Sequence, residues 1–297
     1  MWNGWTGIDL LLPLQDLRES LPNAVTRFFE LITATAFYLV IPILLCILIY
    51  WFYDSHKGDR LILNLITAFN LVNFIKFMVK QPRPWLLDSR IHPTEYSIEH
   101  ATGYSLPSGH TAIAITGYGY AVTIIRKHWI KILLIAVAML IVLARPFLSV
   151  HTPLDIIIGA IIALCVMIVN EIMCDLSEKS DRNFYIITAG YFVFFSILFI
   201  FILTNMDMDY LNTALTMGML YGVLIGRTVN RRYINYTIPK MKFSKGLKIG
   251  LLGLVIIGIL TGMPLIILKI DWLCFIGGLL TSFFIYYYPK YIKKWTE

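Results

Sequence analysis

Long apolar stretches separated by short polar connections dominate this chain of 297 residues. About 20 consecutive apolar residues cross a bilayer as a helix, and many stretches of this chain approach that length. The pattern predicts nine membrane-spanning helices, at about residues 33–53, 61–79, 110–126, 131–148, 154–174, 184–204, 211–229, 247–268 and 271–289. The expected fold class is therefore an all-α polytopic membrane protein, a helical bundle of about nine transmembrane helices.

The two ends of the chain differ from its middle. Residues 1–32 combine Trp2, Trp5 and a short leucine run, which predicts an outward-facing interfacial segment before the first span. Residues 205–297 predict additional C-terminal transmembrane helices. Glycines recur there at four-residue steps, at Gly218, Gly222 and Gly226. This spacing lets helix backbones approach closely, either within one chain or at the seam of a homodimer.

Composition excludes an ordinary soluble domain. The chain is 58% hydrophobic and 14% charged, whereas roughly a quarter of the residues of a soluble domain are charged. The net charge of +7 would suggest a nucleic-acid partner in a soluble protein. Here it is better explained by cytoplasmic loops beside anionic lipid, and no nucleic-acid partner is expected. The four cysteines lack metal-ligand spacing and fit small buried hydrophobes.

Loop charge predicts the orientation. Most of the 25 lysines and arginines fall on one side of the nine-span topology, and the positive-inside rule assigns that side to the cytoplasm. The N-terminus then faces outward and the C-terminus inward. The short loops favour a prokaryotic plasma membrane, with an endoplasmic reticulum membrane and a lumenal site as the alternative.

The first group of candidate residues lies at the outer end of the second span. Lys76 is costly inside a membrane unless it faces protein or water. It shares one helix face with Asn70, Asn73 and Lys80, and the prolines that follow end the helix and leave Arg83 in the exit turn. Extension of Lys76 to the interface is the competing interpretation.

The second group is the sequence Pro107-Ser108-Gly109-His110. Pro107 disfavours a helix at the residue before it, so a helix is expected to start here with Ser108 as its N-cap. Gly109 leaves the first amides open to close approach by an anion, and His110 would lie beside that anion. A plain N-cap followed by an interfacial histidine is the alternative.

The third group is Arg145, His151 and Asp155. Thr152 fits an N-cap and Pro153 the first helical position, so Asp155 could simply cap the helix. Alternatively, Asp155 accepts a hydrogen bond from one ring nitrogen of His151. The other nitrogen is then unprotonated and can act as a nucleophile, as in the orienting role of the aspartate of a serine triad.

Together the three groups resemble the type 2 phosphatidic acid phosphatase superfamily, which includes lipid phosphate phosphatases, glucose-6-phosphatases and haloperoxidases. The family pattern KxxxxxxRP, PSGH and SRxxxxxHxxxD corresponds to Lys76–Pro84, Pro107–His110 and Arg145–Asp155, with Ala144 where the family has serine. The resemblance implies a six-helix membrane phosphatase core over about residues 33–204.

The resemblance also implies a metal-independent, acid-phosphatase-like mechanism without a cofactor. His151 would form a phosphohistidine, His110 would act as general acid and then general base, and Asp155 would support His151. The phosphate would be bound by Lys76, Arg83, Ser108, Gly109 and Arg145.

The expected function is that of an integral membrane hydrolase, a lipid phosphate phosphatase that cleaves a phosphomonoester or diphosphate at the outer membrane face. The site lies at the bilayer surface, which favours a lipid substrate. A sugar-phosphate phosphatase and a lipid phosphotransferase would have the same site. A transporter or flippase is the alternative of another class, because glycine-interrupted helices are common there.

Overall fold

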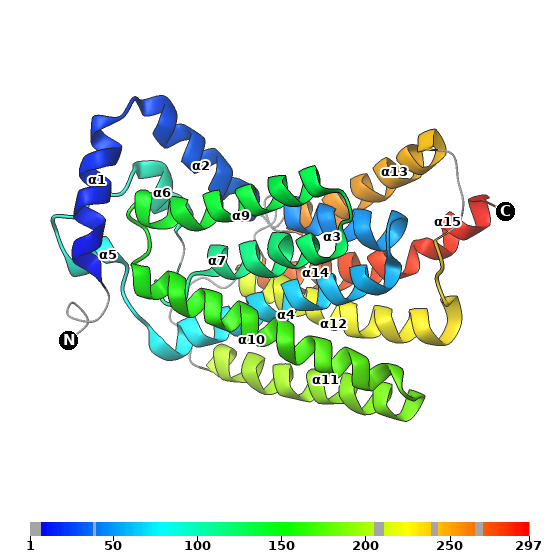
Figure 1. Ribbon diagram of the computed structural model, residues 1–297. Helices are drawn as coiled ribbons and strands as arrows, with labels where there is room; N and C mark the ends of the chain where they lie inside the picture. Colours follow the sequence, from blue (N-terminus) through cyan, green and yellow to red (C-terminus); the bar gives the residue numbers. More distant parts are fainter. Residues whose placement is uncertain are drawn as a thin grey trace. The chain divides into compact units, whose positions relative to one another are not determined.

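Helices are the regular elements of the computed structural model, which describes residues 7–37, 40–101, 103–204, 211–238, 243–264 and 270–296 (Figure 1). No strand occurs in these ranges. The chain divides into two compact units. Unit 1 comprises Met1–Pro42 and Leu71–Met167, and unit 2 comprises Ile43–Asn70 and Ile168–Glu297.

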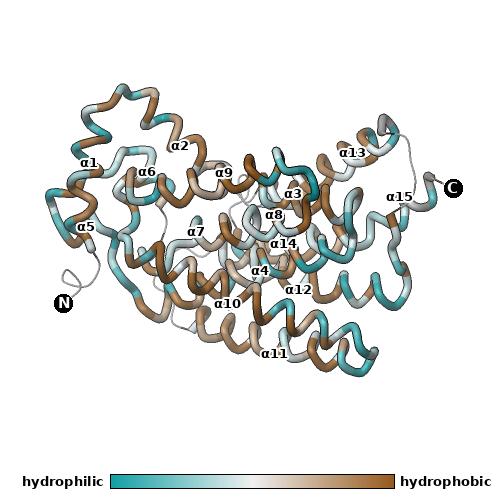
Figure 2. Tube along the Cα trace, viewed as in Figure 1, coloured by the Kyte–Doolittle hydropathy of each residue, from teal (hydrophilic) through white to brown (hydrophobic). Residues whose placement is uncertain are grey.

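Membrane-spanning character is confirmed by length and composition. Six described helical stretches are long and apolar enough to cross a bilayer: Ser55–Leu87, His128–Phe147, Pro153–Glu178, Asp181–Thr204, Lys245–Gly262 and Asp271–Ile292. The apolar helix Ile41–Phe52 is shorter. Figure 2 shows hydrophobic residues along much of α9 and α10, and many of their large apolar side chains are exposed. The protein is an all-α polytopic membrane protein.

Three of the nine predicted spans are not among these six. The stretch predicted at 110–126 is helical without a break from Gly109 to Ile124, as α7 (Gly109–Ile113), the π-helical turn η2 (Ala114–Gly119) and α8 (Tyr120–Ile124). Its length is below that of a usual span. The stretch predicted at 211–229 is α12 (Leu211–Val229). The first predicted span, 33–53, covers the end of α2 and α3, and its residues 38 and 39 lie outside the described ranges.

Unit 1 carries all of the predicted site residues. Besides α7, η2 and α8, its elements are α1 (Leu11–Ser20), α2 (Asn23–Phe37), the end of α4 (Ser55–Val79), α5 (Pro84–Leu87), α6 (Glu95–His100), α9 (His128–Phe147) and the first part of α10 (Pro153–Glu178). The turn after α9 is buried, since Phe147, Leu148 and Val150 form an apolar cluster against which residues of α2 pack. This cluster fixes the segment that carries His151.

Unit 2 contains most of α3 (Val40–Phe52), the rest of α4 and α10, α11 (Asp181–Thr204), α12, the π-helical turn η3 (Asn230–Ile234), α13 (Phe243–Gly262), α14 (Asp271–Tyr287) and α15 (Pro289–Thr296). Helices α12 and α14 pack closely. A Cβ atom on Gly218 would lie 1.9 Å from the carbonyl oxygen of Phe275, and one on Gly222 would lie 2.3 Å from that of Leu279. The four-residue glycine spacing therefore serves packing within the chain, and a homodimer stays a prediction.

Candidate active site

Lys76 lies in the last turn of α4, half-buried. Its Nζ donates to the carbonyl oxygen of Tyr104, and it lies 3.4 Å from the carbonyl oxygen of Ser105. The side chain is thus held by the segment before Pro107 rather than extended toward the interface.

Arg83 follows α4 and is almost fully buried, with 5% of its surface exposed. Its Nε donates to the carbonyl oxygen of Gly103 at 2.9 Å, and its Nη1 donates to that of Val150 at 3.1 Å. The same Nη1 lies 3.1 Å from Nε2 of His151. Arg83 therefore connects the segments that carry the second and third groups of candidate residues.

The protonation of His151 follows from these contacts. A guanidinium can only donate, so Nε2 of His151 accepts from Arg83 and carries no proton. The proton of the neutral ring then lies on Nδ1, which is 3.3 Å from Oδ2 of Asp155. Burial, followed by the positive charges of Arg83 and Arg145, holds the pKa of His151 well below its usual 6.5. At neutral pH Nε2 consequently carries a lone pair, which accepts the hydrogen bond from Arg83.

Asp155 both caps α10 and contacts His151. The amide of Thr152 donates to Oδ2 of Asp155 at 2.8 Å, and the Thr152 hydroxyl accepts from the Asp155 amide at 3.3 Å. This reciprocal pair is a capping box. The two interpretations of Asp155 are therefore compatible, because the capping bond places Oδ2 where it also faces His151.

Ser108 is the N-cap of α7, as predicted. Its hydroxyl accepts from the amide and the hydroxyl of Thr111, at 3.4 and 3.0 Å. Its own amide donates to the backbone oxygen of Asp155 at 2.9 Å. A Cβ on Gly159 would lie 2.6 Å from the carbonyl oxygen of Ser108, so α10 approaches this helix start very closely. That contact fixes the PSGH segment beside His151.

His110 and Arg145 line one small cavity of about 10 Å³, together with Tyr96, Ser97 and His100 of α6 and residues of α2. Arg145 is 5% exposed, and its buried Nε has no hydrogen-bond partner among the described residues. The charges of Arg145, Arg83 and Lys76 all act on His110. The structure therefore brings the two predicted histidines and the three predicted cations into one cluster.

The connection from 85 to 106 has two kinds of polar residue. His92, Glu95 and Glu99 are exposed, as expected for a solvated surface. His100 is half-buried and faces the cavity shared with His110 and Arg145.

Several buried polar residues around the cluster were not predicted. Gln81 and Ser105 both donate to Asp155, at 3.1 and 2.6 Å. Arg18 of α1 donates to the carbonyl oxygen of Phe147, to the hydroxyl of Ser149 and to the carbonyl oxygen of His92. Gln81 and Ser105 lie within or next to recognised motifs, so their position was a usable signal. Arg18 lies about 130 residues from Ser149, and no local pattern marks it.

Comparison with known proteins matches the part of the chain that contains this cluster. The model of the PAP2 superfamily matches residues 59–173, a range that contains every predicted site residue. This region is therefore similar to the PAP2 superfamily. An undecaprenyl-diphosphatase of Sulfolobus acidocaldarius is 35% identical over 125 residues, which cover 41% of this chain and 57% of the relative. The chain thus matches little more than half of that relative's length. No solved structure matches the chain significantly.

Proposed function

We propose that this protein is a phosphatase that hydrolyses a lipid phosphate or diphosphate through a phosphohistidine intermediate. One observation carries the proposal: the charges of three buried or half-buried cations, Lys76, Arg83 and Arg145, act on His151, and Arg83 contacts it directly. The hydrogen bonds of the described cluster include a single carboxylate, that of Asp155. Burying more positive than negative charge is costly, so an anion would stabilise the cluster. A phosphate group supplies that charge and several acceptor oxygens.

The chemistry follows from the side chains. Nε2 of His151 attacks phosphorus while the bond from phosphorus to the leaving oxygen breaks, and His110 protonates that oxygen. Lys76, Arg83 and Arg145, with Ser108 and the Gly109 amide, bind the oxygens on which charge develops. Asp155 stabilises the positive ring of His151. His110 then takes a proton from water, and the attack of that water breaks the bond between Nε2 and phosphorus and releases inorganic phosphate.

Arg83 has two roles in this reaction. Without substrate, the Nη1 of Arg83 donates a hydrogen bond to Nε2 of His151. A phosphate oxygen is a stronger acceptor for a guanidinium than a neutral imidazole is. Substrate binding therefore draws Arg83 onto the phosphate and frees the nucleophile.

A lipid diphosphate is the substrate class that the comparison supports, because the matched relative is an undecaprenyl-diphosphatase. A sugar phosphate, transfer to an acceptor other than water, and lipid or solute transport are the competing functions. We further propose that the reaction needs no metal, since the cations of the cluster supply the positive charge, and that the site faces outward.

The test is phosphate release by purified protein in detergent with EDTA, from isoprenyl diphosphate, isoprenyl phosphate, phosphatidate and glucose 6-phosphate. We expect release from a lipid substrate, and its loss in His151→Ala. His128→Ala, which changes an exposed histidine at the start of α9, should retain full activity. Trapping of ³²P on the wild-type protein and not on His151→Ala would support the intermediate. Activity that EDTA abolishes, or that survives in His151→Ala, would contradict the mechanism.

Sidedness needs a separate measurement. Substrate added outside sealed vesicles of known orientation should be hydrolysed only when the predicted outer face is exposed. Equal hydrolysis in both orientations would contradict the outward site. Lipid flux that His151→Ala leaves intact, with no phosphate release from any substrate, would favour the transporter instead.

A further inference from the structure

Gln81 is a fully buried amide in the segment between α4 and α5. Its Nε2 donates to Oδ1 of Asp155 at 3.1 Å, and its backbone oxygen accepts from the amide of Ser105 at 2.8 Å. Its side-chain Oε1 is buried and has no hydrogen-bond partner among the described residues. The acceptor end of the amide is therefore unused.

This environment is unfavourable for stability. A buried acceptor without a partner keeps its full desolvation penalty, whereas an apolar side chain of similar shape would carry none. Stability therefore does not explain why a polar side chain is buried here with one end unsatisfied. The hydrogen bond that Gln81 makes to the carboxylate beside His151 suggests a functional reason.

The two oxygens of Asp155 have different surroundings. Oδ2 accepts from the hydroxyl of Ser105 at 2.6 Å and the amide of Thr152 at 2.8 Å, and it faces Nδ1 of His151 at 3.3 Å. The side-chain amide of Gln81 contacts the opposite oxygen. Donors on both sides fix the rotation of the carboxylate about its bond to Cβ. That rotation decides whether a lone pair of Oδ2 points at the histidine.

We propose that Gln81 is a positioning residue, which holds the carboxylate of Asp155 in the plane that orients His151 for attack. The inference rests on the proposed function, because it assigns Gln81 a part in the same reaction. Gln81 does not contact the reacting atoms, so its contribution passes through Asp155. It differs from a structural amide in one respect: its removal should lower the rate without lowering stability.

The first test is Gln81→Met, which keeps the length of the side chain and removes the amide. We expect kcat to fall roughly 10- to 100-fold, the range usual for loss of a group that orients a catalytic ligand. KM should change less than about threefold, because the phosphate ligands are untouched. The midpoint of thermal inactivation should stay the same or rise. Phosphoenzyme formation in a single turnover should slow by the same factor as kcat.

Gln15→Met is the matched control. Gln15 is also a buried amide of unit 1, but both of its ends are used. Its Nε2 donates to the carbonyl oxygen of Arg90 at 3.2 Å, and its Oε1 accepts from the amide of His92 at 2.7 Å. This substitution should lower the thermal midpoint and leave kcat unchanged, the opposite of Gln81→Met.

Gln81→Glu provides a second, pH-dependent measurement. When protonated, the introduced carboxyl has the shape of the amide and can donate to Oδ1 of Asp155. When ionised, it repels Asp155, although Lys76 and Arg83 lie nearby and favour its charged form. The ratio of variant to wild-type kcat should therefore rise as pH falls. Taking a ratio removes the titration of His151 and of the substrate, which both proteins share.

The results separate this inference from the proposed function. Wild-type kcat in Gln81→Met, while His151→Ala is inactive, would overturn the positioning role and leave the proposed function intact. A loss of kcat that comes with a lower thermal midpoint, and a pH-independent ratio for Gln81→Glu, would show that Gln81 is structural. A loss of kcat at an unchanged midpoint, with the ratio rising toward acid pH, would support the inference.

Discussion

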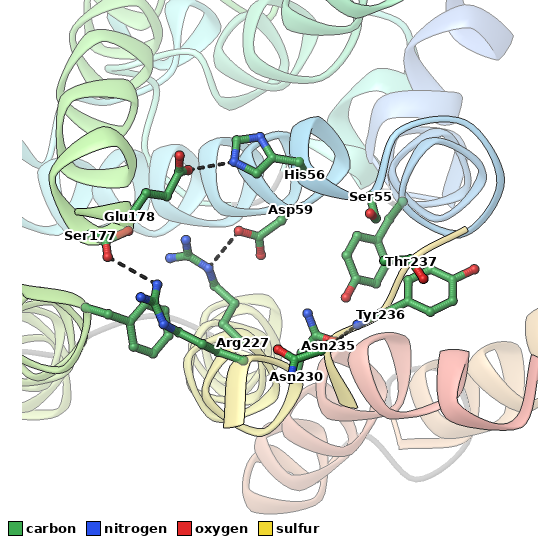
Figure 3. A pocket seen from close by; sticks show the side chains of 13 residues that line it. Ser55, His56, Asp59, Ser177, Glu178, Arg227, Asn230, Asn235, Tyr236 and Thr237 are labelled. Carbon is green, nitrogen blue, oxygen red and sulfur yellow. Dashed lines mark hydrogen bonds and ion pairs between the residues drawn. The ribbon is translucent and has the colours of Figure 1, made fainter. Parts of the chain in front are cut away.

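Each unit of the molecule contains a polar cluster built around arginines, and the two clusters balance their charge differently. In unit 1 the cations Lys76, Arg83 and Arg145 surround two histidines and one hydrogen-bonded carboxylate. In unit 2 a polar cavity of about 430 Å³ is lined by Arg227, Arg231 and several carboxyl, hydroxyl and amide groups (Figure 3). Size alone would favour the second cavity as the site.

The charges of the unit 2 cluster are paired. Arg227 donates to Asp59 at 2.9 Å, and the second oxygen of Asp59 accepts from the hydroxyl of Tyr286 at 2.6 Å. Figure 3 shows Arg227 directed at Asp59 and His56 directed at Glu178. Two further arginines have carboxylate partners: Arg60 with Glu171, Asp175 and Glu178, and Arg231 with Asp181. Carboxylates outnumber cations in this cluster.

The comparison indicates what distinguishes a phosphate site from a structural ion-pair network. Within unit 2 each arginine of the cluster has a carboxylate partner, so no anion is required. Within unit 1 the positive charge exceeds the negative, and the Nε of Arg145 is buried without a partner among the described residues. Loss of an arginine should therefore have opposite consequences in the two units.

The largest effect is expected for Arg145→Met in unit 1. This residue would bind the charge that develops on phosphate, and arginines in that role contribute roughly 10³- to 10⁵-fold to phosphoryl transfer. We expect kcat/KM to fall by about that factor. Because the substitution removes an unpaired buried charge, the thermal midpoint should not fall. A variant that keeps more than about a tenth of wild-type kcat/KM would remove Arg145 from the phosphate site.

Arg227→Met in unit 2 should give the reverse result. It leaves Asp59 in the protein with one partner fewer, and breaking a buried ion pair costs roughly 3–5 kcal/mol. We expect a clearly lower thermal midpoint and unchanged kcat for the protein that remains folded. The test is to measure the thermal midpoint and, separately, the activity divided by the folded fraction of the protein. If activity per folded molecule falls while the midpoint holds, the division between a catalytic and a structural cluster is wrong.

Part of the site was predictable because its signals are local. The Ser108 cap depends on the residues beside it, and the polar face with Lys76 depends on helical spacing. The capping box of Thr152 and Asp155 lies within four residues, and so does the contact of Asp155 with His151. Short-range geometry of this kind can be inferred from spacing alone.

The remainder depends on contacts between distant segments. Gln81 meets Asp155 across 74 residues, and Arg18 meets Ser149 across 131. In the sequence each is one polar residue among many, and nothing local indicates its partner. The π turn at η2 likewise interrupts the α-helical hydrogen bonding within a predicted span, although its residues fit a regular apolar helix. The charge balance of the two clusters belongs to the same class, because it depends on which carboxylates reach which arginines.

The smallest effect we predict concerns backbone packing, and it is tested by substituting one glycine in each unit. Gly159→Ala in unit 1 would place a methyl group 2.6 Å from the carbonyl oxygen of Ser108, an atom of the backbone that cannot rotate away. Overpacking of this kind costs typically 1–3 kcal/mol, and here it displaces the helix start that holds the phosphate. We expect kcat/KM to fall about tenfold, with a modestly lower thermal midpoint.

Gly258→Ala on α13 of unit 2 is the matched control, because a Cβ there meets no atom within 4 Å. Alanine is favoured over glycine inside a helix by about 1 kcal/mol, so this variant should be as stable as the wild type or more so, with full activity. Assays of both variants under the same conditions, together with their thermal midpoints, give the comparison. Equal activity of the two would show that the close approach of α10 to Ser108 does not position the phosphate site. A loss confined to Gly159→Ala would show that backbone packing in unit 1 contributes to catalysis in addition to the unpaired charge.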